Sequence, residues 1–170
     1  MLTTLAPADV ERLAGWEGDA EVTRFAGRRF GQPAGAWRWW ERVRSDPRHR
    51  VLGIRTADGR LVGDVELADI NWARREAELR IRIGDRRFRG RGLGRDAVRA
   101  AVAYAARLGL RRVFLRVDVR NVVAIRCYEA AGFRRQGRLW AGRRRAEGVS
   151  DMYLMVRDLT PERAASGWGG

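Results

Sequence analysis

The chain has 170 residues, which suits one domain, with 45% hydrophobic and 33% charged residues. Its formal net charge is +14, and all 35 residues in the Lys+Arg class are arginine, since no lysine occurs. A single cysteine, Cys127, excludes an internal disulfide, and one cysteine with one histidine argues against a Cys/His zinc site or a Ser-His-Asp triad.

The N-terminal part of the chain predicts one edge strand and three helices. We expect these elements at residues 2–5, 7–17, 19–26 and 34–44. Pro7 opens the first helix and Pro47 ends the last, because proline is tolerated in a first helical turn and stops a helix elsewhere. His49 follows in a polar run, so we expect it in a solvated loop.

The helix expected at 34–44 carries three tryptophans. Trp37 and Trp40 are spaced i and i+3 and therefore share a face. We expect that face to pack against the core, which leaves Trp39 without a specific role. The alternative is that the three rings form an aromatic lip over a substrate.

The rest of the chain mixes strands with two further helices. An Asp-Gly pair at 58–59 indicates a hairpin between the first two strands. Helices are expected at 92–108 and 122–131, and strands at 51–55, 61–68, 76–83, 111–118, 133–140 and 151–157. This order predicts an α+β fold, with a mixed, mostly antiparallel central sheet of about seven strands flanked by helices. We expect one domain over residues 1–158 and a flexible tail over 159–170.

A basic, glycine-rich turn joins the strand 76–83 to the helix 92–108. Unpaired N–H groups and the positive dipole end meet at a helix N-terminus, so the turn predicts a phosphate or pyrophosphate site. No P-loop string G-x-x-x-x-G-K-S/T occurs. Gly92 to Ala97 fits G-x-G-x-x-A, with Asp118 downstream. A dinucleotide fingerprint starts where its strand ends, however, and here charged residues intervene, which argues against it.

Two strings identify the turn more closely. Residues 89–94 read Arg-Gly-Arg-Gly-Leu-Gly and match Q/R-x-x-G-x-G/A, and residues 121–133 match N-x-x-A-x-x-x-Y-x-x-x-G-F. In this order and at this separation, the strings resemble the signatures of the GNAT acyltransferase superfamily. The segment after Gly132 is similar to the branch that acetylates ribosomal-protein N-termini and polyamines. The resemblance covers residues 50–158.

This resemblance implies an N-acetyltransferase that takes acetyl-CoA as co-substrate and transfers acetyl directly to a primary amine. The acceptor would be a small molecule or a protein N-terminus. By the same resemblance, backbone groups of a strand, the turn and a second helix hold the cofactor. The residues concerned are Ile81, Arg82, Ile83, Arg89, Gly90, Arg91, Gly92, Leu93, Gly94, Asn121 and Tyr128.

The resemblance also assigns catalytic roles. Tyr128 would be the general acid that protonates the CoA thiolate; the alternative is a tyrosine that only packs on the pantetheine. Glu78 matches the position of the general base, and Glu66 on the preceding strand is the second candidate, acting through a water. The alternative for Glu78 is an ion pair with an arginine such as Arg75 or Arg80.

Two other classes of function stay open at this stage. The positive charge also fits a nucleic-acid-binding domain, although the arginines are spread along the chain among 21 acidic residues. A CoA-binding sensor without catalysis is the third interpretation. We expect Cys127 to be buried rather than nucleophilic. With no signal peptide or long apolar run, we expect a cytoplasmic protein without a membrane partner or bound metal, and a homodimer is a possible assembly.

Overall fold

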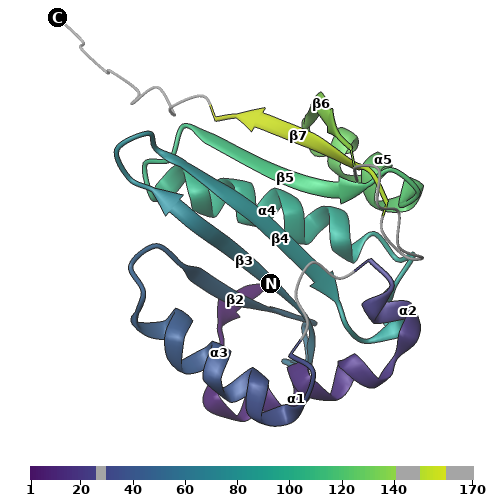
Figure 1. The fold of residues 1–170 in the computed structure, drawn as a ribbon. Helices are drawn as coiled ribbons and strands as arrows, with labels where there is room; N and C mark the ends of the chain where they lie inside the picture. Colours follow the sequence, from purple (N-terminus) through teal and green to yellow (C-terminus); the bar gives the residue numbers. More distant parts are fainter. Residues whose placement is uncertain (26–29, 141–149, 160–170) are drawn as a thin grey trace, which may run out of the picture.

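The computed structural model describes residues 1–25, 30–140 and 150–159, and in them one sheet of seven strands is flanked by five α-helices (Figure 1). The strands are β1 (Leu2–Thr4), β2 (Arg50–Arg55), β3 (Leu61–Asn71), β4 (Glu76–Ile83), β5 (Arg112–Asp118), β6 (Arg134–Leu139) and β7 (Met152–Asp158). The helices are α1 (Pro7–Gly15), α2 (Ala20–Thr23), α3 (Pro33–Ser45), α4 (Leu93–Arg107) and α5 (Val122–Ala130), and short 3-10 helices span Trp16–Gly18 and Arg86–Phe88.

The sheet has the order β1-β2-β3-β4-β5-β7-β6. Neighbouring strands are antiparallel except β4 and β5, which are parallel. The expected α+β fold with a mixed, mostly antiparallel sheet is therefore confirmed. The hairpin at Asp58–Gly59 is also confirmed, because Gly59 has a φ of 83° and the N–H of Thr56 donates to the carbonyl of Arg60.

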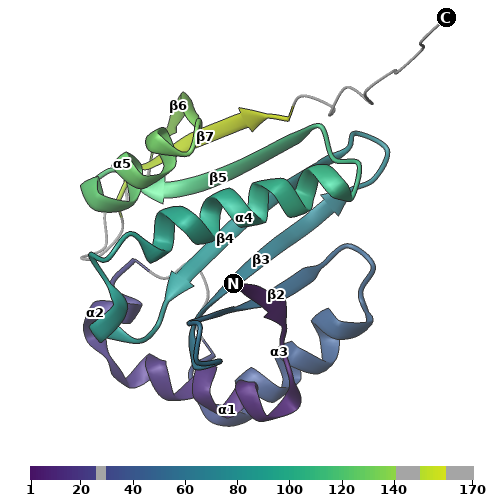
Figure 2. The ribbon, with the colours of Figure 1, turned by 180° about the vertical axis from the view of Figure 1, so that it is seen from behind.

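Helix α4 covers one face of the sheet and closes the main core (Figure 2). Its small apolar side chains let the helix approach the strands closely, and they repeat at the helical period that the sequence showed. They pack in one cluster with side chains of β3, β4, β5 and β7. The buried residues of α4 are Ala97, Val98, Ala101, Val102 and Ala105.

A second, smaller core lies between α1, α3 and the strands next to them. Trp39 is buried there, with its ring centroid 5.3 Å from that of Phe30. The expectation that Trp37 and Trp40 both face the core and that Trp39 has no specific role is only partly right, since Trp39 is the buried ring, whereas Trp40 is half-buried against this core and Trp37 is half-buried without being part of it. Spacing alone cannot decide between two possible faces, and here the docking of α3 onto α1 and β2 selects the other one. The buried face of α3 consists of Ala36, Trp39 and Val43.

Strands β4 and β5 separate soon after they start. Their backbones pair only from Glu76↔Arg112 to Glu78↔Phe114, although β4 continues to Ile83 and β5 to Asp118. The two strands diverge visibly in Figure 1. One edge of the second half of β4 is left without a strand partner.

Two element boundaries differ from the expectation. Helix α2 is shorter than the predicted 19–26, and residues 26–29 lie outside the described part. Leu159, which was assigned to the tail, is buried in the main core, and its N–H donates to the carbonyl of Arg111 at 2.8 Å. The remainder of that segment also lies outside the described residues. None of the described helices is both long and apolar enough to cross a bilayer.

Gly63 provides a test of how β3 and β4 fit together. It lies opposite Ile83, and a Cβ built on it would lie 2.3 Å from the carbonyl oxygen of Arg82. Because the obstacle is backbone, Gly63→Ala forces the strands apart, and we expect a loss of about 2 kcal/mol and a fall in Tm of roughly 4–8 °C. The measurement is thermal unfolding followed by circular dichroism.

Gly137→Ala in β6 is the matched control, because a Cβ there meets nothing within 4 Å. We expect the Tm of that variant to stay within about 2 °C of the wild type. Equal shifts for the two variants would show that the close approach at Gly63 is not what limits stability.

Candidate active site

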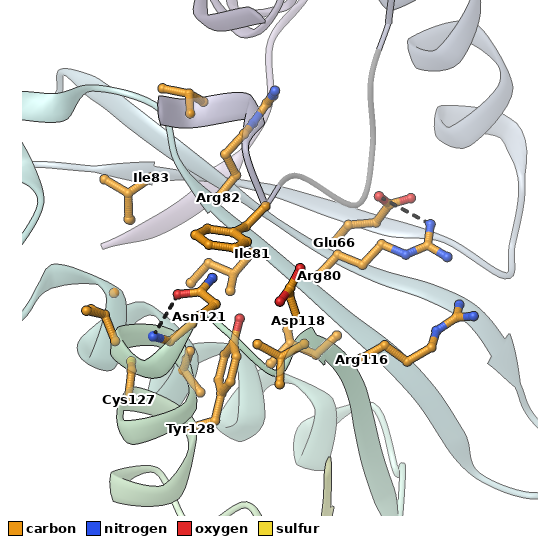
Figure 3. Close-up of a pocket in the computed structure, with 18 of the residues that line it drawn as sticks. Glu66, Arg80, Ile81, Arg82, Ile83, Arg116, Asp118, Asn121, Cys127 and Tyr128 are labelled. Carbon is orange, nitrogen blue, oxygen red and sulfur yellow. Dashed lines mark hydrogen bonds and ion pairs between the residues drawn. The ribbon is translucent and has the colours of Figure 1, made fainter. Parts of the chain in front are cut away.

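A cleft of about 1250 Å³ opens where β4 and β5 separate (Figure 3). Its walls come from the start of α4, from α5, and from the ends of β4 and β5; α2, α3 and β3 close its other side. Typical small-molecule sites occupy roughly 300–1,000 Å³, so this cleft has room for two ligands side by side.

The glycine turn forms one end of the cleft. Gly90 and Gly92 have φ values of 71° and 80°, a left-handed conformation that favours glycine. A Cβ at either position would meet nothing within 4 Å, so the requirement is conformational. Gly92 is the N-cap of α4 and no side chain caps the helix there. The backbone N–H groups of its first turn, where Gly94 also lines the cleft, are therefore left for an anionic ligand.

The arginines of the turn have different positions. Arg89 donates two hydrogen bonds to the carbonyl oxygen of Ile83, at 3.1 and 2.9 Å, and so ties the turn to the end of β4. Arg91 is exposed, and Leu93 packs against the main core; neither lines the cleft. Arg95, which the sequence did not single out, does line it. The charge that faces this end of the cleft thus comes from Arg89 and Arg95.

Helix α5 forms the opposite wall. Asn121 caps it by accepting the N–H of Ala124 at 3.2 Å, and Asn121 also lines the cleft. Tyr128 projects from α5 with its hydroxyl in the cleft (Figure 3). Burial, with a smaller effect of the Cys127 thiol, raises the pKa of Tyr128, so the phenol keeps its proton at neutral pH. Cys127 is half-buried, and burial raises its pKa too, which makes it a poor nucleophile.

Glu78 is buried at the last rung of the β4–β5 pairing. Arg116 donates to its two carboxylate oxygens at 2.8 and 2.9 Å, and Arg80 donates to one of them at 2.6 Å. Burial opposes ionisation, but these hydrogen bonds and charges outweigh it and hold the pKa of Glu78 below its usual value. The ion pair with Arg80 that the sequence offered as an alternative is therefore present, and Arg116 rather than Arg75 is the second partner.

Glu66 is 1% exposed in β3 and lies opposite Arg80 in the strand register. Its Oε1 is 2.9 Å from Nδ1 of His49, and its Oε2 is 3.9 Å from Nη1 of Arg80. Nε2 of His49 lies 3.6 Å from a carboxylate oxygen of Asp46. The expectation of a solvated His49 is wrong, because its side chain is 14% exposed and lines the cleft. Glu66 itself was the available signal, since an acidic residue in a buried strand requires a partner.

Arg82 occupies the same face of β4 as Arg80, two residues further along the strand. Its Nε donates to Oδ1 of Asp64 at 2.9 Å, and the rings of Trp16 and Phe30 lie 5.7 and 5.6 Å from its guanidinium carbon. Nη1 and Nη2 are buried and have no hydrogen-bond acceptor in the described part of the chain. The sequence assigned Arg82 to the cofactor through its backbone and missed this side chain, which also lines the cleft.

No group of three or more histidine, cysteine or acidic side chains is placed to hold a metal ion in the described ranges. The polar groups that line the cleft include the phenol of Tyr128, the His49–Glu66 pair and several arginines. Glu66, Arg80, Arg116, Asp118, Asn121 and Tyr128 can be compared directly in Figure 3.

Known proteins share this fold. A crystal structure of spermidine N-acetyltransferase from Vibrio cholerae, in complex with CoA and spermine, superimposes with a TM-score of 0.86. It covers 95% of this chain and 96% of that one at 23% sequence identity. Identity this low establishes a common fold and no more.

Sequence comparison adds shorter but closer matches. The chain is 35% identical over 95 residues to spermidine N(1)-acetyltransferase of Vibrio cholerae serotype O1, a match that covers 55% of this chain and 54% of that protein. It is 39% identical over 83 residues to the Escherichia coli K12 enzyme of the same name, over 48% and 44% of the two chains. The chain thus spans about half the length of these curated relatives. The model of the acetyltransferase (GNAT) domain matches residues 1–134, and the chain therefore belongs to the GNAT acetyltransferase family.

Proposed function

We propose that this chain transfers the acetyl group of acetyl-CoA directly to a primary amine, with both substrates bound in the cleft. One observation carries the proposal: the uncapped start of α4, the unpaired edge of β4 and the phenol of Tyr128 all border one cleft. Membership of the GNAT family supports it. The amide N–C bond forms as the thioester C–S bond breaks; of the two protons lost by the ammonium, one ends on the thiol and one in solvent.

The chain offers two features that suit acetyl-CoA, which supplies the acetyl group as a thioester. The glycine turn presents backbone N–H groups at a helix N-terminus, the arrangement that proteins use for diphosphates. The edge of β4 between Ile81 and Ile83 has no β5 partner, so its backbone polar groups are available to an extended ligand, except the carbonyl of Ile83, which accepts from Arg89. An N–H group of this edge is also suited to the negative charge that develops on the carbonyl oxygen.

Tyr128 supplies the proton that the departing thiolate needs. The phenol is protonated at neutral pH, because burial raises its pKa. A thiol is a stronger acid than a phenol, so complete transfer to a free thiolate runs uphill. Donation therefore accompanies C–S cleavage, when the sulfur is most basic.

The acceptor amine has to lose a proton before it attacks, at a cost of about 4–5 kcal/mol for an ordinary alkylammonium at neutral pH. We assign the removal of that proton to the His49–Glu66 pair rather than to Glu78. Both oxygens of Glu78 are held by arginines and its pKa is lowered, which makes it a weak base. The imidazole of His49 has a ring nitrogen that can accept a proton, and Glu66 fixes the orientation of the ring through the other nitrogen.

A small amine is the acceptor class that we propose over a protein N-terminus. The relatives named above are spermidine acetyltransferases, and spermidine is a small amine. A cytoplasmic location agrees with the co-substrate, because a molecule as highly charged as acetyl-CoA does not cross a bilayer unaided.

Tyr128→Phe tests the general acid. The phenylalanine keeps the ring and its packing on Phe133 but cannot donate a proton, so we expect kcat to fall at least tenfold, by about the usual size of general-acid effects, with the KM for acetyl-CoA little changed. Release of the CoA thiol, followed with a thiol reagent, measures both constants.

Tyr104→Phe is the matched control, since Tyr104 lies in α4 and outside the cleft lining. Its kcat should stay within about twofold of the wild type. A Tyr128→Phe enzyme of wild-type rate would reduce Tyr128 to a packing residue.

The pH dependence of kcat/KM tests the base. A base works only when unprotonated, so the rate falls as pH drops through its pKa. The pKa of Glu78 is held below its ordinary value of 4.5, so its acidic limb would lie below the usual assay range. We expect Glu78→Gln to leave the acidic limb between about pH 5 and 8 in place, and His49→Gln and Glu66→Gln to abolish or displace it. Loss of that limb in Glu78→Gln alone would return the role to Glu78.

A further inference from the structure

We propose that the acceptor is a primary amine that also carries a carboxylate, and that Arg82 binds this carboxylate, with Arg24 and Arg42 at the mouth of the cleft. This inference rests on the acetyl transfer proposed above and names the class of amine.

The guanidinium of Arg82 has unused donors. Among the described residues, only the one of its five N–H groups that lies on Nε has a partner, the carboxylate of Asp64. Trp16 and Phe30 approach the guanidinium within cation–π range, but that attraction acts through the ring faces and does not supply an acceptor for N–H groups. The side chain is 9% exposed, and a buried charged donor without an acceptor is unfavourable. A carboxylate matches the paired Nη groups in geometry and in charge.

The carboxylates along the cleft are already engaged by cations or imidazole. A polyamine requires a carboxylate for each ammonium group beyond the one that reacts, whereas these groups have partners among the described residues. The pairs are Glu21 with Arg86, Glu66 with His49, Glu78 with Arg80 and Arg116, and Asp118 with Arg120. Two further cations line the mouth: Arg24 follows α2, Arg42 lies on α3, and both are exposed without an ion pair to a described carboxylate.

The mouth of the cleft thus attracts anions and its wall holds an unsatisfied guanidinium. A compound with a single reacting amine and a carboxylate nearby fits both features. Spermidine, which gives the relatives their name, carries only positive charge and would meet Arg24, Arg42 and Arg82, whereas the carboxylates along the cleft are already paired with other groups.

A set of matched acceptors tests this on the wild-type enzyme. Lysine, lysine methyl ester and cadaverine share a five-carbon diamine skeleton, and only lysine carries a carboxylate. We expect kcat/KM for lysine to exceed that for cadaverine, and for spermidine, by at least tenfold. The methyl ester is the control for amine basicity, because esterification lowers the pKa of the α-amine below that of lysine. If basicity decides the rate, the ester reacts faster than lysine. If the carboxylate decides it, the ester reacts only as fast as cadaverine.

Three variants locate the effect. Arg82→Lys keeps the charge beside Asp64 but loses the fork, and should raise the KM for lysine about tenfold while leaving the KM for cadaverine and acetyl-CoA unchanged. Arg42→Gln should raise the KM for lysine two- to fivefold. Arg44→Gln, on the same helix and exposed but outside the cleft lining, should not. If Arg82→Lys fails to fold, the wild-type acceptor series and the Arg42/Arg44 pair still show whether the carboxylate of the acceptor is bound.

The outcomes separate the two proposals. Thiol release with lysine and little with cadaverine, lost in Arg82→Lys, supports the carboxylate site. Equal or faster turnover of cadaverine or spermidine overturns the carboxylate site and leaves acetyl transfer standing. Absence of acetyl-CoA-dependent turnover with every amine overturns the proposed function itself, and with it this inference.

Discussion

The early separation of β4 and β5 is the constraint on which the rest of the site depends. Backbone pairing ends at Glu78 and Phe114, and Arg116, two residues further along β5, reaches back across the opening to the carboxylate of Glu78. This ion pair therefore joins the two strands at the point where the hydrogen-bond ladder stops. The buried carboxylate of Glu78, paired with both Arg80 and Arg116, therefore connects β4 and β5 at the start of the opening. The same two ion pairs lower the pKa of Glu78, which makes it poorly suited to accept a proton.

The arginine-rich composition has a structural use on this face of the sheet. Asp64, Glu66 and Glu78 are buried on adjacent strands, and a buried carboxylate without a partner would cost several kcal/mol, on the order of 3–5 when one member of a pair is removed. Arg80 and Arg82 lie opposite Glu66 and Asp64 in the register and supply the compensating charge. The planar fork of arginine lets one side chain serve two acceptors, as Arg80 does for Glu78 and Asp69. A lysine offers no such fork.

The predictable parts of the site are those encoded within a few residues of each other. The glycine turn, the cap formed by Asn121 and the position of Tyr128 on α5 each depend on local spacing, and all three were found from the sequence. The pairing of His49 with Glu66 depends on how distant elements dock, and so does the enclosure of the Arg82 guanidinium, with its buried Nη groups, by Trp16 and Phe30. Local spacing limits a helix such as α3 to a few candidate faces, but only its neighbours select one of them.

The register between β3 and β4 determines both which side chains enter the core and which arginines line the cleft. Strand β3 pairs with β4 without irregularity from Gly63↔Ile83 to Ala68↔Glu78, and the bulge that follows, with Asp69 at a φ of 50°, lies beyond the cleft. Side chains alternate across a strand, so a slip of one residue would exchange the charged row for the apolar one. It would turn Arg80 and Arg82 toward α4, and Leu79 and Ile81 toward the face that now carries the arginines. The apolar contacts that fix the register of the core therefore also determine which arginines face the acceptor. The bulge places the irregular pairing where it affects neither the core contacts nor these arginines.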